Sequence, residues 1–207
     1  MALTVEDLED QSRFRQLLEI RYNELIPFIV DYLRRKSALT MFFWAVCFAF
    51  FLIALGVRLK LVYIFPHGRI MLHSLLGLVV FPLLSIPLHE GLHIIPFFLS
   101  GARNIRIGMD LKQYLFYVTA HRYVASPLQF RIIALIPFIL ISSAFLVFLY
   151  LAPGLWKWSI SLFLFSHATM CAGDFALLNY YFLNRNKKIY TWDDADRKVA
   201  YFYEEIL

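Results

Sequence analysis

The sequence contains few cysteines, and their placement rules out several common architectures. Cys47 and Cys171 are the two cysteines among 207 residues, and each lies inside an apolar segment. This pattern excludes a small domain held together by disulfides and a zinc ribbon built from paired cysteines. Internal repeats, low-complexity tracts and glycine-serine linkers are also missing. The chain length therefore suits one compact unit.

Charged residues are scarce compared with apolar ones. They make up 17% of the chain, whereas 60% is hydrophobic. A soluble domain is usually about 45–50% apolar, so this chain has more apolar residues than a water-surrounded core can hide. The expected surroundings are a lipid bilayer. The net charge of +5 is modest, and we expect no nucleic-acid partner. The polar, acidic start of the chain does not read as a cleavable signal peptide.

Four apolar segments each reach the roughly 20 residues that a membrane-spanning helix needs. They cover residues 39–57, 71–100, 132–152 and 155–183. The second segment is long enough to tilt, kink or break at its prolines. We therefore expect an all-α polytopic membrane protein with four transmembrane helices.

The segments outside these spans carry weaker patterns. Apolar residues recur at helical spacing over residues 4–36, which predicts an amphipathic helix with Thr4 as its N-cap and Asp7 three residues later. Alternating apolar and polar residues over 104–124 predict one or two short strands in a cytoplasmic loop, with a turn near 110–113. The C-terminal tail is polar, and its pattern does not separate strand from helix. The predicted divisions are 1–38, 39–185 and 186–207.

Basic residues cluster near alternate ends of the apolar segments. They lie at 34–36, in the loop at 103–131 and at 185–188, whereas the opposite ends carry fewer. Positive charge near the ends of spanning helices marks the cytoplasmic side. We expect both termini and the 101–130 loop in the cytoplasm of a bacterial cell, with the protein in its inner membrane.

The second apolar segment contains the sequence HEGLH at residues 89–93. His89 and His93 are four residues apart, so on a helix they lie one turn apart on one face and could share a zinc ion. Glu90 could take a proton from water activated there, as in zinc peptidases. Three fixed residues are a short motif, but ionisable residues inside a membrane segment are costly and usually functional. The alternative is a polar patch that binds neighbouring helices.

A third zinc ligand is expected from the fourth apolar segment. Asp174 is its one acidic residue. By distance from the nearest basic cluster, Asp174 and the two histidines lie at similar depth toward the cytoplasm. His167 lies about 10 Å from Asp174 along a straight helix. It is therefore predicted to be an alternative ligand to Asp174, or to act behind the ligands or polarise substrate, rather than to bind the metal together with Asp174. Cys171 is interpreted as a packing residue.

Several of these elements resemble a family of small bacterial membrane proteins classed as "putative zincin peptidases", originally a domain of unknown function. The matching elements are HEGLH, FFLSGA at 97–102, the strand-like RIGMDLKQYLFYVTA, LIPFIL in the third segment and the Gly-Asp pair at 173–174. More distantly the arrangement is similar to site-2 proteases, in which glycine follows the aspartate instead of preceding it. The resemblance implies a membrane-embedded metallopeptidase.

The sequence thus favours a Zn²⁺-dependent intramembrane protease. Its ligands would be His89, His93 and Asp174, its general base Glu90, and its substrate a peptide or membrane protein in the lipid bilayer. A non-enzymatic zinc carrier or sensor with the same ligands is the alternative, and a structural protein whose polar patch binds another helix is a third. The oligomeric state stays open, a homo-oligomer included.

Overall fold

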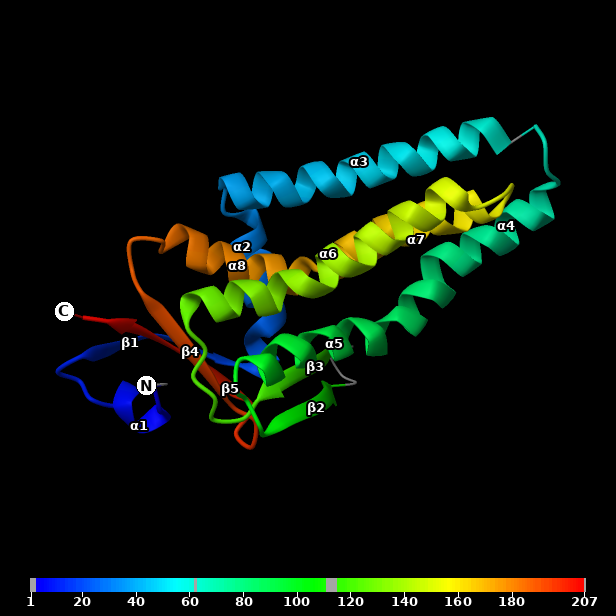
Figure 1. The fold of residues 1–207 in the computed structure, drawn as a ribbon. Coiled ribbons are helices and arrows are strands. Elements are labelled where there is room, and N and C mark those ends of the chain that lie inside the picture. The colour runs from blue at the N-terminus through cyan, green and yellow to red at the C-terminus, as the bar shows by residue number, and fades with distance from the viewer. Residues whose placement is uncertain (1–2, 62, 111–114, 207) are drawn as a thin grey trace.

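The structure, a computed structural model, describes residues 3–61, 63–110 and 115–206. Long helices lie side by side in an elongated bundle, and the strands gather at one end of it together with both chain termini (Figure 1). The fold is not the all-α architecture that the sequence predicts, because five strands form two antiparallel sheets. The predicted turn at 110–113 lies largely outside the described residues.

Three helical stretches are long and apolar enough to cross a membrane. They are α3 (Ala38–Leu61), the continuous stretch His67–Leu99, and α6 (Pro127–Leu151). The prediction of four spanning helices is therefore wrong in its count. The fourth apolar segment divides into α7 (Trp156–Met170) and α8 (Ala172–Leu183), which meet at an angle of 44°. Each half alone is shorter than a span requires.

The helical stretch His67–Leu99 has three parts. They are α4 (His67–Leu75), the π-helical turn η2 (Leu76–Val80) and α5 (Phe81–Leu99). The irregularity comes just before Pro82, whose missing N–H cannot complete a regular turn. Helix α5 then runs unbroken through Pro87 and Pro96. The long segment thus departs from α-helical geometry at the π-turn rather than at the prolines that flank HEGLH.

The N-terminal segment is mostly not the amphipathic helix that its periodicity predicts. The one-turn helix α1 (Val5–Leu8) has the expected Thr4 cap, with Asp7 completing a capping box. Residues 14–21 instead form strand β1 (Phe14–Arg21), followed by the short 3₁₀ turn η1 (Tyr22–Glu24) and helix α2 (Leu25–Arg34). These residues form a strand rather than a helix because they pair with a second strand, and tertiary pairing overrides local periodicity.

The larger sheet joins the two ends of the chain. Its strand order is β1–β5–β4, with β4 spanning Ile189–Asp194 and β5 spanning Val199–Glu205, and both pairings are antiparallel. Backbone hydrogen bonds connect Ala125, just before α6, to Thr191 on β4, with N–O distances of 2.8 and 3.1 Å. The sheet is thereby fixed against the end of the helical bundle.

The smaller sheet is a hairpin, as the alternating pattern predicts. Strand β2 (Ile105–Asp110) pairs with β3 (Leu115–Ala120) in antiparallel register. Its apolar face packs on the end of α5 and on α6 in a cluster that contains Phe97, Ala120 and Ile133. Hairpin, larger sheet and α2 therefore surround the end of the bundle that carries HEGLH.

Large apolar side chains cover the outer faces of the long helices. On α5, Leu83, Leu84 and Leu88 are 61%, 70% and 53% exposed. Exposed apolar surface on this scale is expected where lipid, not water, surrounds a protein. This surface supports membrane association for the helical bundle.

Close packing of the π-turn against α7 gives a test of the fold. A Cβ added at Gly77 would lie 2.4 Å from the Ser159 backbone oxygen and 2.8 Å from Leu162 Cβ. Because helix backbones cannot yield cheaply, we expect Gly77→Ala to lower the free energy of unfolding in detergent by about 1–3 kcal/mol. Gly56→Ala on α3, where no atom lies within 4 Å of the new Cβ, is the control. Equal stability of the two variants would contradict the described packing.

Candidate metal centre

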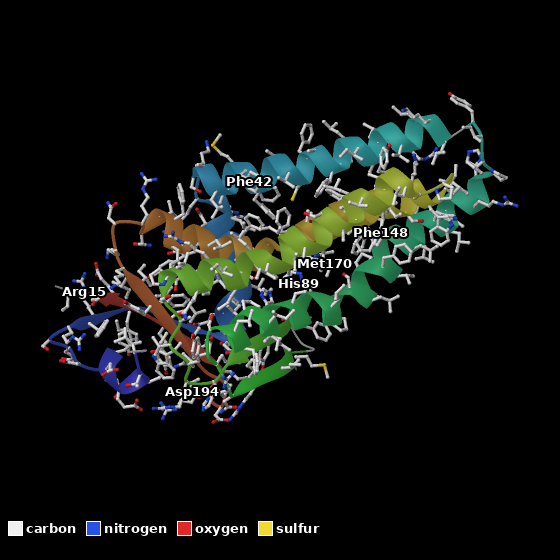
Figure 2. The ribbon with its side chains drawn as sticks, viewed as in Figure 1. Arg15, Phe42, His89, Phe148, Met170 and Asp194 are labelled. Atoms are coloured by element: carbon white, nitrogen blue, oxygen red, sulfur yellow. The ribbon has the colours of Figure 1, made fainter. Side chains whose placement is uncertain are left out.

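Helix α5 places the two histidines of HEGLH on its buried face. His89 is 7% exposed and His93 is 8% exposed, and their ring centroids are 5.1 Å apart. A ligand atom from each histidine and a carboxylate oxygen of Glu90 all lie within 4.8 Å of one another. His89 lies in the interior of the molecule, on the side of α5 that faces the other helices (Figure 2).

The bend between α7 and α8 brings Asp174 against both histidines. Asp174 lies in the first turn of α8. Its Oδ2 is 3.3 Å from His89 Nε2 and its Oδ1 is 3.6 Å from His93 Nε2. The structure therefore brings together the two histidines and the aspartate that the sequence singles out. Asp174 lies 81 residues after His93 in the chain, so the fold, not the local sequence, places them in contact.

The hydrogen bonding of His93 leaves one nitrogen facing the carboxylate without a proton. Its Nδ1 lies 2.9 Å from the Ile133 carbonyl oxygen. A carbonyl oxygen only accepts hydrogen bonds, so Nδ1 carries the hydrogen. In the neutral ring Nε2 then has no hydrogen and carries a lone pair. This lone pair and the Asp174 carboxylate are both acceptors. A cation held between them, or a second proton on the ring, removes the repulsion.

The contacts of Asp174 have the length that separates ligand atoms around zinc. Tetrahedral zinc with bonds of about 2.0–2.1 Å holds its ligand atoms about 3.4 Å apart, and one oxygen of Asp174 lies near this distance from His89 Nε2 and the other from His93 Nε2. A single ion on all three residues would draw one carboxylate oxygen toward both imidazoles, because the described groups that contain His89 and already have all ligand atoms within 4.8 Å combine it with Glu90 and His93, or with His167 and Cys171. Two imidazoles and a carboxylate are also a donor set that zinc accepts in peptidases, with one position left for water. The residues present fit this metal.

His167 lies behind His89 and does not line the cavity beside it. Its Nε2 is 3.4 Å from His89 Nδ1, so it lies on the opposite side of that ring from Asp174. The distance of about 10 Å between His167 and Asp174 assumed a straight helix, whereas helix α7 ends at Met170. Both residues contact His89. His167 and Cys171 are fully buried. Together with His89 they form a second group of residues that could bind a metal ion, but an ion held there would lie away from the cavity.

A cavity of about 390 Å³ opens beside HEGLH. Its wall includes His89, Glu90, His93 and Asp174, and apolar side chains from α2, β3, α6 and β5 complete it. A site of this size, apolar with a few convergent polar groups, is typical of a ligand or substrate site.

Strand β3 presents its free edge to this cavity. The His121 N–H donates to the Asn104 carbonyl at 2.9 Å, which sets the hydrogen-bonded pairs of the hairpin. By the alternation of antiparallel pairing, Tyr117 and Thr119 bond to β2, whereas the backbone groups of Phe116 and Val118 point away from it. The Val118 amide accordingly lies beside the Glu90 carboxyl.

Sequence reasoning missed a second polar group of residues in the cavity wall. Tyr22, Thr119 and Asp193 line it together with the HEGLH residues. The Tyr22 hydroxyl donates to Asp193 Oδ1 at 3.3 Å, and the Tyr22 ring contacts Tyr117 edge to face with centroids 4.7 Å apart. Aromatic and β-branched residues in IYTWDD and VAYFYEE are the signal that could have predicted strands there.

His121 lies outside the cavity. Its Nδ1 accepts a hydrogen bond from the Ala195 amide at 3.1 Å, and Asp194 and Asp196 lie 4.0 and 3.6 Å from its ring nitrogens. These contacts fasten the end of β3 to the β4–β5 turn, near the labelled Asp194 (Figure 2). They account for this histidine without a catalytic role.

Comparison with known proteins gives one match. The model of a family described as "putative zincin peptidase" matches residues 82–190, which include HEGLH and Asp174. No curated protein and no solved structure matches the chain, so the distant similarity to site-2 proteases stays a prediction. The match covers more than half of the chain, and the protein belongs to this family of zincin-type metallopeptidases.

Proposed function

We propose that the protein is a zinc-dependent protease that hydrolyses a peptide bond in or near the membrane. The observation that carries this proposal is the convergence of His89 Nε2 and His93 Nε2 on the Asp174 carboxylate, beside a cavity that also contains Glu90. Family membership supports a metallopeptidase. Location of HEGLH on an apolar helical stretch of 33 residues supports activity at the membrane.

Each residue of the centre has a separate task in this proposal. His89, His93 and Asp174 hold the metal, which supplies a Lewis acid for activating water and polarising a peptide carbonyl. Glu90 accepts a proton from the attacking water and later delivers it to the leaving amine nitrogen, so it ends the cycle in its starting form. The Ile133 carbonyl fixes the ring of His93, and His167 fixes that of His89.

The free edge of β3 offers a way to hold the substrate extended. A peptide in a helix hides its carbonyls, so the segment to be cut must unwind. Backbone groups of Phe116 and Val118 face the cavity and can pair with an extended peptide by strand addition. Because Val118 lies beside Glu90, the paired peptide would pass next to the general base.

The same geometry would serve a carrier or sensor that binds zinc without cutting anything. The free strand edge beside Glu90 favours the protease, because a carrier has no need to extend a peptide there. In both cases we propose that the centre faces the cytoplasm. The basic clusters at 34–36, 103–131 and 185–188 favour the cytoplasmic side for these segments, and both chain termini lie with the strands at one end of the bundle (Figure 1).

Replacing the general base separates metal binding from catalysis. We expect Glu90→Gln to keep its zinc, because Glu90 is not a ligand, and to lose about 10²–10⁴-fold in cleavage of a membrane peptide. Zinc is measured by X-ray fluorescence on the purified protein and cleavage by mass spectrometry. Full cleavage by this variant would contradict the protease proposal. Equal zinc content in the variant and the wild type, with no cleavage by the wild type, would favour the carrier.

Replacing the carboxylate tests its role as a ligand. Asp174→Asn removes a charged oxygen donor, so we expect at least about 100-fold weaker zinc binding in a chelator competition. Asp31→Asn, at an exposed position on α2, should leave zinc affinity unchanged. Equal affinity in the two variants would remove Asp174 from the ligand set.

A proline in β3 tests strand addition. Phe116→Pro removes the amide hydrogen that points from this position away from β2 and leaves the pairing with β2 intact, so the edge strand should tolerate it. It also leaves in place the Val118 amide that lies on the Glu90 carboxyl. We expect kcat/KM to fall about tenfold, because a single backbone hydrogen bond is lost. Phe116→Ala keeps the amide and is the matched control. A loss equal to that of Phe116→Ala would argue against substrate pairing on this edge.

A further inference from the structure

We propose that Tyr22, Thr119 and Asp193 form a subsite that binds a basic side chain of the substrate, in the same cavity as HEGLH. The subsite rests on the proposed protease function and narrows its substrate class. It consists of three polar residues brought together from the N-terminal turn η1, strand β3 and strand β4. All three belong to the cavity wall.

The position of Asp193 is held from two sides. Its backbone carbonyl accepts a hydrogen bond from the Arg122 amide at 2.9 Å, and one carboxylate oxygen accepts from the Tyr22 hydroxyl. Tyr22 is 6% exposed, so its hydroxyl cannot swing away to water. The Thr119 hydroxyl also lies within hydrogen-bonding reach of this carboxyl. The carboxyl lines the cavity, where its remaining lone pairs can accept from a ligand.

Thr119 adds a buried hydroxyl at the same place. The residue is 3% exposed, and its hydroxyl lies beside both the Asp193 carboxyl and the Tyr22 hydroxyl. A bound donor group such as an ammonium or guanidinium can bond to this oxygen as well as to the carboxylate.

The charge of the cavity points to a cationic ligand. Its described lining residues include the carboxyls of Glu90, Asp174 and Asp193 but no lysine or arginine. A zinc ion would balance the charges beside it, whereas Asp193 makes no ion pair with a described residue. Burial raises the pKa of Asp193 to about 6, from an ordinary value of 3.8. At pH 7 the carboxyl is still mostly ionised, and a cation would stabilise it.

The subsite lies close to the bond that would be cut. Thr119 directly follows Val118, which lies beside Glu90, and residues along a strand are about 3.3 Å apart. A basic side chain bound there would come from a residue within a few positions of the cleaved bond. Lysine and arginine are enriched where membrane segments enter the cytoplasm, so the subsite fits a substrate cut at that boundary.

Two of the three subsite residues come from the terminal segments of the chain. Tyr22 and Asp193 lie outside the residues 82–190 that match the family model, whereas Thr119 lies inside them. In this proposal the terminal segments that form the larger sheet contribute to specificity, and the matched segment contributes the metal centre.

Binding of a matched peptide pair to the catalytically silenced full-length protein tests the subsite. The probes are fluorescent extended peptides that carry either lysine or norleucine at one position, which is moved along the peptide, and the protein is Glu90→Gln in detergent. At one position we expect the lysine peptide to bind about tenfold more tightly, because its ammonium pairs with a buried carboxylate. Adding Asp193→Asn should bring the ratio close to one.

Two further variants keep the outcome clear. Tyr22→Phe removes the hydroxyl but keeps the ring, and it should reduce the ratio partially, whereas Asp31→Asn, at an exposed position on α2, should leave it unchanged. A ratio near one at every position, or a preference that survives Asp193→Asn, would overturn the proposal. If the wild type cleaves no peptide but the lysine preference depends on Asp193, the subsite stands and the protease function fails.

Discussion

The structure depends on holding two imidazoles and two carboxyl groups inside an apolar helical bundle. Each of these groups is costly to bury alone. His93 makes the constraint explicit, because its bond to the Ile133 carbonyl turns an unprotonated nitrogen toward the Asp174 carboxylate. A shared zinc ion would convert this opposition of acceptors into ligation. The buried polar cluster would then stabilise the bundle as well as form its proposed reaction centre.

Two breaks in regular helix serve this centre. The chain leaves helical geometry at Cys171, and the resulting 44° bend places both His167 and Asp174 against His89. The π-turn before α5 packs closely on α7. The two terminal segments then pair in one sheet at the same end of the bundle and close the cavity from the outside. The residues of the proposed metal centre, of the strand edge and of the proposed subsite thus line one cavity although they come from the whole length of the chain.

Much of the centre is readable from the sequence, and much of its setting is not. HEGLH and Asp174 stand out because ionisable residues are rare in apolar segments, and the alternation of Ile105, Ile107 and Met109 reveals the hairpin. The N-terminal segment reads as helix because its apolar residues also fit helical spacing, and its strand exists only through pairing with β5, almost 180 residues later. No local pattern carries that pairing. The bend at Cys171 is equally hard to predict. Thr169 and Gly173 are weak helix formers, but the apolar run continues across them and gives no sign of a break.

Zinc K-edge X-ray absorption on the purified protein tests the central claim most directly. It reports the element and the distances of the ligand atoms that bind it. The account predicts a shell of nitrogen and oxygen atoms at about 2.0–2.1 Å with histidine scattering and no sulfur. A sulfur ligand at about 2.3 Å would move the metal to the group of His89, His167 and Cys171, and absence of zinc would remove the metal centre altogether. Either result would contradict the account.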